Sequence, residues 1–320
     1  MVSTNKTLPN FFVVGAPKAG TTTLYHYLDQ HPQIYMSPIK EPNYFATEIR
    51  PQNLGEELQE QAVRDLAALQ EYLWGPMNEK RFGGMVTEWD DYLRLFRGVK
   101  GEKAIGEASV CYLWSKTAAQ NIHDAVGRAK IVMILRDPAD RAFSQYLEAL
   151  ANGRIKSSFA DQIEESRTRK DDKFHLMHPF LELGRYHEQV RRYMEQFGEE
   201  NILILFYESY GNQLAQCLRE VYQFLDVDPD FASGASQRLL EPQVPRLSAA
   251  MRLLRKYGVS QQIRKLSPAG LERFLRGAAF RKRRSLVMSR EDRNCLIEYY
   301  EDDIRKLSHL LHRDLTAWLS

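Results

Sequence analysis

The sequence predicts a single α/β domain in which helices flank a central, mostly parallel sheet. Short apolar runs with strand character alternate with longer stretches of helical periodicity, and this alternation is typical of βαβ units. The first apolar run ends in a glycine-bounded loop, GAPKAGTTT at residues 15–23, which leads directly into a helical pattern. Such a strand–loop–helix turn presents backbone N–H groups and the positive end of a helix to an anion, as a P-loop does. We therefore expect a P-loop-like domain.

Each element of this domain can be located from its pattern. Strands are expected at residues 11–14, 33–36, 104–105, 131–135 and 202–206. Helices are expected at residues 21–30, 116–126, 139–150, 184–196 and 212–225, and a last helix from 289 towards 318. Ser289, with Asp292 three positions later, suits a capped start of that last helix. Ligands of parallel sheets bind beyond the carboxyl ends of the strands, so the glycine loop and the end of 131–135 can serve one ligand.

Length and composition set further limits. The chain has 320 residues, is 43% hydrophobic and shows no repeat or low-complexity linker, so we expect one domain over residues 1–320. Residues 46–100 and 151–183 look like insertions, and residues 276–288 form a basic segment. A formal net charge of +2 gives no indication of nucleic-acid or membrane-surface binding, so anion binding must be local.

Cysteine usage and hydropathy bear on the compartment. The three cysteines are far apart and form no CxxC pair, which argues against a disulfide framework or structural zinc and suits a reducing compartment. No apolar run approaches the roughly 20 residues of a membrane helix, and the N-terminus lacks the apolar core of a signal peptide. We expect a cytoplasmic protein without a transmembrane segment.

The loop at residues 15–23 is predicted to bind a terminal phosphate or sulfate. Its glycines allow the backbone to approach the anion, Lys18 adds a mobile charge, and three threonines add hydroxyl donors. The loop differs from the nucleoside-triphosphatase pattern GxxxxGK[ST], because Thr21 stands where the lysine should follow Gly20. No apolar strand ends in an isolated aspartate that would hold Mg²⁺, so we expect no metal.

A second anion site is predicted in LRDPADRAFSQY at residues 135–146. Arg136 ends a strand, Pro138 suits the first turn of a helix, and Ser144 lies two helical turns further on. An arginine fork with a hydroxyl can hold a second phosphate. In the alternative interpretation, Arg136 pairs with a structural carboxylate and Ser144 serves packing.

A candidate base lies in PIKEPNYF at residues 38–45. Pro38 and Pro42 favour an extended segment, which holds Glu41 on a rigid stretch beside Lys40. A carboxylate there could remove a proton from an acceptor hydroxyl. The alternative is that Glu41 is an ordinary surface charge.

Together the three segments resemble the sulfotransferases that use 3′-phosphoadenosine 5′-phosphosulfate (PAPS). GAPKAGTTT is similar to the 5′-phosphosulfate loop of that family, and LRDPADRAFSQY is similar to its 3′-phosphate motif. IKEPNYF resembles the KEPHFF-type segment of the carbohydrate branch, notably the heparan sulfate O-sulfotransferases. The spacings from Lys18 to Glu41 and from Arg136 to Ser144 also match. Residues 184–186, 202–208 and 300–318 look like those of bacterial members.

The resemblance implies an enzyme that moves a sulfuryl group from PAPS to a hydroxyl of a carbohydrate or glycoconjugate and releases 3′,5′-ADP. It implies that Glu41 is the base and that Lys18 neutralises charge on the leaving nucleotide. The implied cofactor-binding residues are Gly15, Ala16, Pro17, Lys18, Ala19, Gly20, Thr21, Thr22, Thr23, Arg136 and Ser144, together with one or more of Arg281, Lys282, Arg283 and Arg284 in a loop that covers the nucleotide. The residues expected at the acceptor are Lys40, Glu107, Ser109 and Tyr112.

Other functions are open at this point. The acceptor could be a small secondary metabolite or a peptide tyrosine instead of a saccharide. A P-loop small-molecule kinase would need the lysine and the Mg²⁺ ligand that this chain lacks. A non-catalytic nucleotide-binding module would not need Lys18 and Glu41. His175 and His178, in the acceptor-side insertion, are the rival bases to Glu41.

Overall fold

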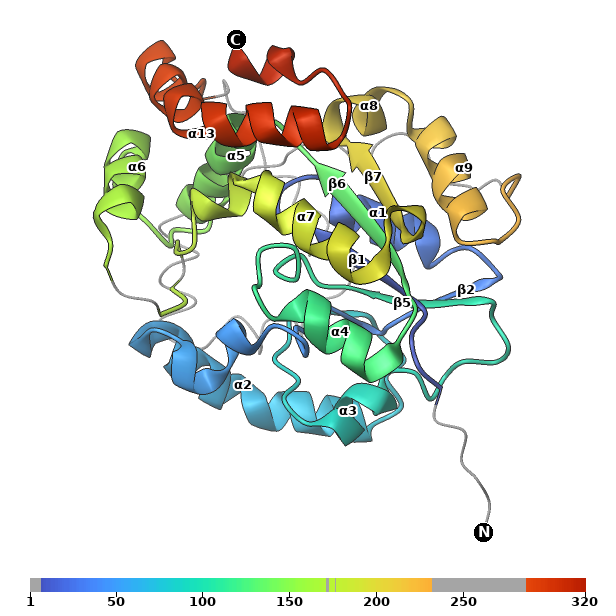
Figure 1. The fold of residues 1–320 in the computed structure, drawn as a ribbon. Helices are drawn as coiled ribbons and strands as arrows, with labels where there is room; N and C mark the ends of the chain where they lie inside the picture. Colours follow the sequence, from blue (N-terminus) through green and yellow to red (C-terminus); the bar gives the residue numbers. More distant parts are fainter. Residues whose placement is uncertain (1–6, 171–172, 176, 232–285) are drawn as a thin grey trace, which may run out of the picture.

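A computed structural model of the chain describes residues 7–170, 173–175, 177–231 and 286–320. Its centre is a five-stranded sheet in the order β2–β5–β1–β6–β7 (Figure 1). All neighbouring strands of this sheet run parallel. The strands are β1 (Phe11–Gly15), β2 (Ile34–Met36), β5 (Ala104–Ala108), β6 (Lys130–Leu135) and β7 (Ile202–Phe206). This confirms the predicted parallel α/β fold.

Helices cover both faces of the sheet. In Figure 1, α4 (Ala118–Val126), α7 (Tyr186–Phe197) and α13 (Arg290–Leu310) lie side by side in front of the sheet, and α1 (Thr21–Leu28) lies behind it. The other α-helices of the described ranges are α2 (Glu56–Trp74), α3 (Trp89–Arg94), α5 (Pro138–Ala151), α6 (Phe159–Thr168), α8 (Tyr207–Asn212) and α9 (Leu214–Phe224). Short 3₁₀ turns are η1 (Thr47–Ile49), η2 (Pro51–Asn53), η3 (Glu182–Gly184), η4 (Glu199–Asn201) and η6 (Thr316–Leu319).

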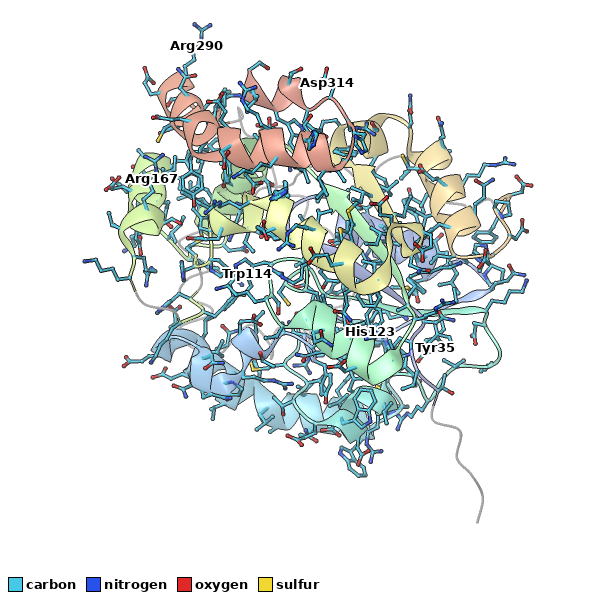
Figure 2. The ribbon with its side chains drawn as sticks, viewed as in Figure 1. Tyr35, Trp114, His123, Arg167, Arg290 and Asp314 are labelled. Atoms are coloured by element: carbon cyan, nitrogen blue, oxygen red, sulfur yellow. The ribbon has the colours of Figure 1, made fainter. Side chains whose placement is uncertain are left out.

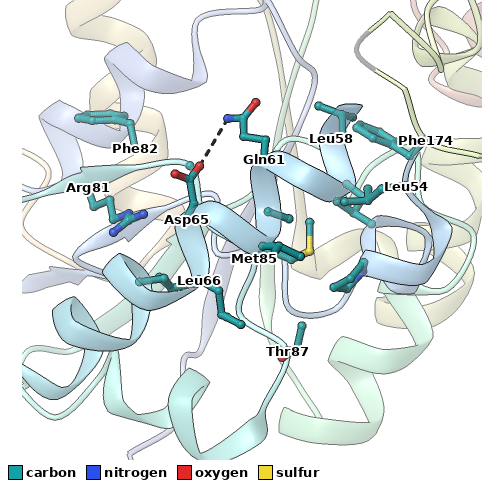
Figure 3. Close-up of a pocket in the computed structure, with 17 residues that line it drawn as sticks. Leu54, Leu58, Gln61, Asp65, Leu66, Arg81, Phe82, Met85, Thr87 and Phe174 are labelled. Carbon is teal, nitrogen blue, oxygen red and sulfur yellow. Dashed lines mark hydrogen bonds between the residues drawn. The ribbon is translucent and has the colours of Figure 1, made fainter. Parts of the chain in front are cut away.

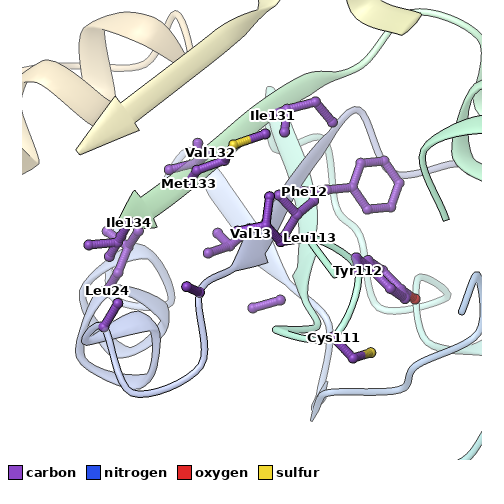
Figure 4. Close-up of a cluster of buried hydrophobic side chains, with 14 of the residues drawn as sticks. Phe12, Val13, Leu24, Cys111, Tyr112, Leu113, Ile131, Val132, Met133 and Ile134 are labelled. Carbon is purple, nitrogen blue, oxygen red and sulfur yellow. The ribbon is translucent and has the colours of Figure 1, made fainter. Parts of the chain in front are cut away.

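The core forms around β1 and β6, because these central strands are covered by helices on both faces. Their side chains from residue 11 to 14 and from residue 131 to 135 have no exposed surface. Strands that are buried on both faces read as continuous apolar runs, which is why these two were recognisable. Figure 4 shows their side chains gathered with Leu24 of α1 and with Leu113, which follows β5.

The first insertion and the segment just before it contain structure that the sequence pattern did not predict. A small parallel sheet pairs β3 (Ile39–Lys40) with β4 (Arg81–Phe82), and α2 and α3 lie before and after β4. Strands of two residues are too short to show alternation, so no pattern could identify them. β5 also continues to Ala108, beyond the predicted end at residue 105. The prediction ended too early because Gly106 and Glu107 interrupt the apolar run of this strand.

Within the second insertion, α6 begins at a capping box formed by Ser158 and Asp161. Within the described ranges, no helix has the length and apolar character needed to cross a membrane.

Candidate active site

The loop after β1 leads into an uncapped helix. Gly15 ends the strand where a Cβ would lie only 2.7 Å from Leu113 Cβ, so a side chain does not fit there. Gly20 adopts a left-handed conformation (φ 91°), and α1 begins at the next residue. No side chain caps this helix, and no acidic residue stands in its first turn. The first N–H groups of α1 are therefore available to an anion.

Threonine side chains surround this helix end. Thr22 is exposed, whereas Thr21 and Thr23 are mostly buried. None of the three hydroxyls hydrogen-bonds to another residue in the part of the chain that the structure describes. These hydroxyls are positioned as donors for a ligand that approaches the helix end.

Arg136 joins the end of β6 to the glycine loop. Its Nη1 donates a hydrogen bond to the carbonyl oxygen of Lys18 (2.9 Å), and its guanidinium carbon lies 4.4 Å from the centre of the Tyr207 ring. The Nε of Arg136 is buried and has no hydrogen-bond partner among the described residues. A buried, unpartnered donor is costly, so this nitrogen favours an acceptor supplied by a ligand.

Helix α5 begins two residues after Arg136. Asp137 caps it, because Oδ1 accepts hydrogen bonds from the backbone N–H groups of Ala139 (2.9 Å) and Asp140 (3.1 Å). Ser144 lies two turns along α5, and Glu148 follows one turn later on the same face.

Glu148 connects this face to the loop, since its Oε1 lies 3.1 Å from Lys18 Nζ. The structure thus brings together the loop, Arg136 and the face of α5 that carries Ser144.

Glu41 directly follows β3 and lies beside the end of β5. Its backbone N–H donates to the carbonyl oxygen of Ala108 (2.7 Å), and Ala108 pairs with Val13 of β1. The side chain is 33% exposed, and Oε1 accepts a hydrogen bond from Lys40 Nζ (2.8 Å). Oε2 has no hydrogen-bond partner within the described ranges. Glu41 and Lys18 form no hydrogen bond or ion pair with each other, and the loop of Lys18 follows the adjacent strand β1.

Lys40, which was expected at the acceptor, is only 2% exposed. The structure therefore places its ammonium against Glu41 instead of on an open surface.

Below Glu41 lies a buried carboxylate. Glu107 has no exposed surface, and its two oxygens accept hydrogen bonds from Tyr92 (3.0 Å), Tyr112 (2.9 Å) and Ser109 (2.8 Å). Burial raises the pKa of Glu107 from its ordinary value of 4.5 to about 7, although the three hydroxyls act in the opposite direction.

The same hydroxyls hold the backbone that follows Glu41. Ser109 Oγ accepts from the N–H of Asn43 (3.2 Å), and the Tyr112 hydroxyl accepts from the N–H of Phe45 (3.2 Å). Glu41 and Asn43 both have positive φ, at 68° and 59°. Ser109 and Tyr112 were expected in the acceptor cleft with Glu107, and the structure places all three beneath the Glu41 segment, without exposed surface.

The remaining predicted residues are the two histidines of the second insertion and the basic cluster at residues 281–284. His175 and His178 form an isolated bridge in which the N–H of His175 donates to the carbonyl oxygen of His178 (2.8 Å). The cluster Arg281, Lys282, Arg283 and Arg284, and most of the segment 276–288, lie outside the described residues. Among the residues that are described, no group of three or more His, Cys, Asp or Glu side chains could hold a metal ion.

Sequence reasoning missed four residues of the site: Glu148, Tyr207, Tyr92 and Asn43. Two of them had a signal, because Glu148 lies one helical turn after Ser144 and Tyr207 directly follows a strand. Tyr92 had none, since it reaches Glu107 from within the first insertion.

Comparisons with known proteins agree with this geometry. The profile of the sulfotransferase family matches residues 9–231. A crystal structure of a sulfotransferase from Alicyclobacillus acidocaldarius has a TM-score of 0.71 and 29% identity, and the match covers 98% of this chain and 100% of that one.

Two similar curated proteins come from Mus musculus. Carbohydrate sulfotransferase 15 is 24% identical over 69% of this chain and 44% of its own length. Bifunctional heparan sulfate N-deacetylase/N-sulfotransferase 4 is 26% identical over 98% of this chain and 31% of its own length. The chain therefore spans less than half of these two relatives. The family profile covers more than two thirds of the chain, and on this evidence the chain belongs to the sulfotransferase family.

Proposed function

We propose that this protein transfers a sulfuryl group from PAPS to a hydroxyl of a carbohydrate or glycoconjugate. The observation that carries the proposal is the hydrogen bond from Arg136 to the Lys18 carbonyl oxygen, because it joins the segments of the two predicted anion sites. One site is the uncapped start of α1, and the other is formed by Arg136 and the α5 face that bears Ser144. A nucleotide with separate 5′ and 3′ anionic groups suits this pair.

The residues present fit that donor. The N–H groups and hydroxyls at residues 20–23 would hold the 5′-phosphosulfate, and Lys18 Nζ would neutralise charge on the bridging phosphate oxygen. The unpartnered Nε of Arg136 and the hydroxyl of Ser144 would hold the 3′-phosphate. PAPS supplies an activated sulfuryl group, whose bond to the phosphate oxygen breaks as the acceptor oxygen bonds to sulfur.

Glu41 is the proposed base. Lys40 holds Oε1, so Oε2 is the atom that can accept the proton of the acceptor hydroxyl. Ser109 and Tyr112 of the Glu107 cluster hydrogen-bond to the backbone N–H groups of Asn43 and Phe45, and we assign Glu107, Ser109 and Tyr112 as positioning residues. The saccharide acceptor is supported by the names of the two mouse relatives.

The test is release of 3′,5′-ADP from PAPS in the presence of a panel of saccharide acceptors. Lys18→Ala and Glu41→Gln should each lower the rate by about 10²-fold or more, because each removes a charge that acts at the reacting atoms. Lys103→Ala and Glu298→Gln are matched controls at exposed positions and should keep the wild-type rate. Equal melting temperatures would show that all four variants are folded. Unchanged release in both Lys18→Ala and Glu41→Gln would defeat the proposal.

A further inference from the structure

A cavity of about 400 Å³ lies between α2 and the segment that includes β4 (Figure 3). Most of its lining is apolar, with contributions from Leu54, Leu58, Ala62, Leu66, Met85 and Phe174. Figure 3 shows Arg81 and Asp65 near one end and Leu54 and Phe174 near the other. The lining is therefore mostly apolar, and Arg81 and Asp65 lie on the side opposite Phe174.

Large apolar side chains remain exposed around this cavity. Val63 is 66% exposed, Leu66 49% and Phe82 54%, and all three line it. Clustered exposed apolar surface of this kind is typical of binding sites. The volume lies within the range of about 300–1,000 Å³ that ligand pockets occupy, and a mostly apolar lining with a few polar groups is their usual character.

The wall of the cavity is one strand away from the proposed base. Phe82 pairs with Lys40, and the N–H of Gly83 donates to the Lys40 carbonyl oxygen (2.9 Å). A Cβ on Gly84 would lie 3.7 Å from the Glu41 carbonyl oxygen. Gly84, which lines the cavity, therefore lies next to the backbone of Glu41, so the cavity and the segment that carries Glu41 are neighbours.

We propose that this cavity receives the hydrocarbon portion of an amphipathic acceptor, such as an alkyl-bearing glycoconjugate, whose hydroxyl lies at Glu41. This inference rests on the proposed function and names the class of acceptor. Contact between the cavity and the hydrocarbon portion of the acceptor supplies affinity in proportion to the apolar area removed from water. The polar head of the acceptor then needs only to be oriented. A free, fully polar saccharide would leave the cavity unused.

Binding to the cavity can be measured without catalysis. N-phenyl-1-naphthylamine, a neutral apolar fluorophore, should bind saturably, and octyl glucoside below its micellar concentration should displace it, whereas methyl glucoside should not. Ala62→Trp fills the cavity and should weaken probe binding at least tenfold. Ala67→Trp, an exposed position on the same helix outside the cavity, is the matched control. Leu66→Lys is a second variant, which puts a charge on the cavity lining and should also weaken probe binding. Because Leu66 is half-exposed, this change does not require the surrounding side chains to repack.

Catalysis links the cavity to the site. With a set of octyl and methyl glycosides as acceptors, kcat/KM for 3′,5′-ADP release should be at least tenfold higher for the octyl forms, because burial of a few methylenes gives a factor of about this size. Ala62→Trp should remove this preference, and Ala67→Trp should keep it.

Failure of the proposed function can be distinguished from failure of the inference about the cavity. No binding of 3′,5′-ADP and no turnover would reject the proposed function, whereas probe binding would still report on the cavity. Any one of three results would overturn the inference about the cavity. The first is equal kcat/KM for the octyl and methyl glycosides, and the second is unaltered probe binding in Ala62→Trp. The third is no turnover of any octyl acceptor by protein that binds 3′,5′-ADP.

Discussion

At the scale of single residues, Lys18 is held at two points. Its carbonyl oxygen accepts a hydrogen bond from Arg136, and its ammonium pairs with Glu148. The backbone of Lys18 is therefore bound to the residue after β6, and its side chain is bound to α5. Lys18 also has positive φ (66°), which a lysine rarely adopts without such restraint. The ammonium is thereby held against α5, where Glu148 is its ion-pair partner.

Removal of the Glu148 charge should strengthen cofactor binding. A bound anion has to compete with this carboxylate for Lys18, and an ion pair as exposed as this one is weak. We expect Glu148→Gln to bind 3′,5′-ADP about twofold to fivefold more tightly by isothermal titration calorimetry, and Glu298→Gln, at an exposed position of α13, to bind it as the wild type does. Weaker binding by Glu148→Gln would instead show that the carboxylate orients Lys18 for the ligand.

At the scale of elements, the proposed base Glu41 lies on an irregular segment that hydrogen-bonds to the end of β5 and the residues after it. Residues 41–45 are neither helix nor strand, and their N–H groups are bonded to Ala108, Ser109 and Tyr112. Glu107 binds these last two side chains, so one buried carboxylate supports the whole segment. Buried polar networks of this kind define a unique geometry only when every member has its partner.

This cluster predicts how stability depends on pH. The pKa of Glu107 is about 7 in the folded protein and near 4.5 when it is unfolded, so the folded state binds more protons between these values. Stability contributed by protonated Glu107 is therefore present below about pH 4.5 and is lost as the pH rises towards 7, by about 3 kcal/mol at most. Urea unfolding should show wild type losing stability relative to Glu107→Gln between about pH 5 and 7.5. A constant difference between the two would contradict the raised pKa.

At the scale of the whole molecule, the parallel order of β5, β1 and β6 brings their carboxyl ends to one edge. That edge carries Glu41 beside β5, the glycine loop after β1 and Arg136 after β6. α13, from the far end of the chain, packs against α5 and α7 and holds the Asp137 cap through Arg293 (2.8 Å). The site thus depends on the global fold and not on any one segment.

A ligand that engages both anion sites should stabilise the whole domain. At about 100 times its Kd, 3′,5′-ADP should add about 2.7 kcal/mol and raise the melting temperature by several degrees. ATP and 5′-AMP lack the 3′-phosphate and should give much smaller shifts at the same concentration. A larger shift with ATP would favour the kinase alternative instead.

Much of this architecture was readable in advance, because the features concerned are local. The apolar runs of β1 and β6 and the loop GAPKAGTTT between β1 and α1 depend on residues adjacent in sequence. Lys18 could be named as a candidate because it lies in that loop, Arg136 because it follows the apolar run of β6, and Glu41 because Pro38 and Pro42 mark a rigid segment around it. The two-residue strands β3 and β4 could not be predicted, since their pairing is the only sign of them.

Sequence alone was enough to predict the parallel sheet, the glycine loop that leads into α1 and the residue types at the strand ends, because strand periodicity and turn chemistry are short-range properties. Tertiary structure alone decided that Lys18 pairs with Glu148, that Lys40 is buried against Glu41, and that Glu107 lies beneath that segment with Tyr92. These contacts join residues that are far apart in the chain or depend on burial. Their positions follow only once the helices and insertions have packed around the sheet.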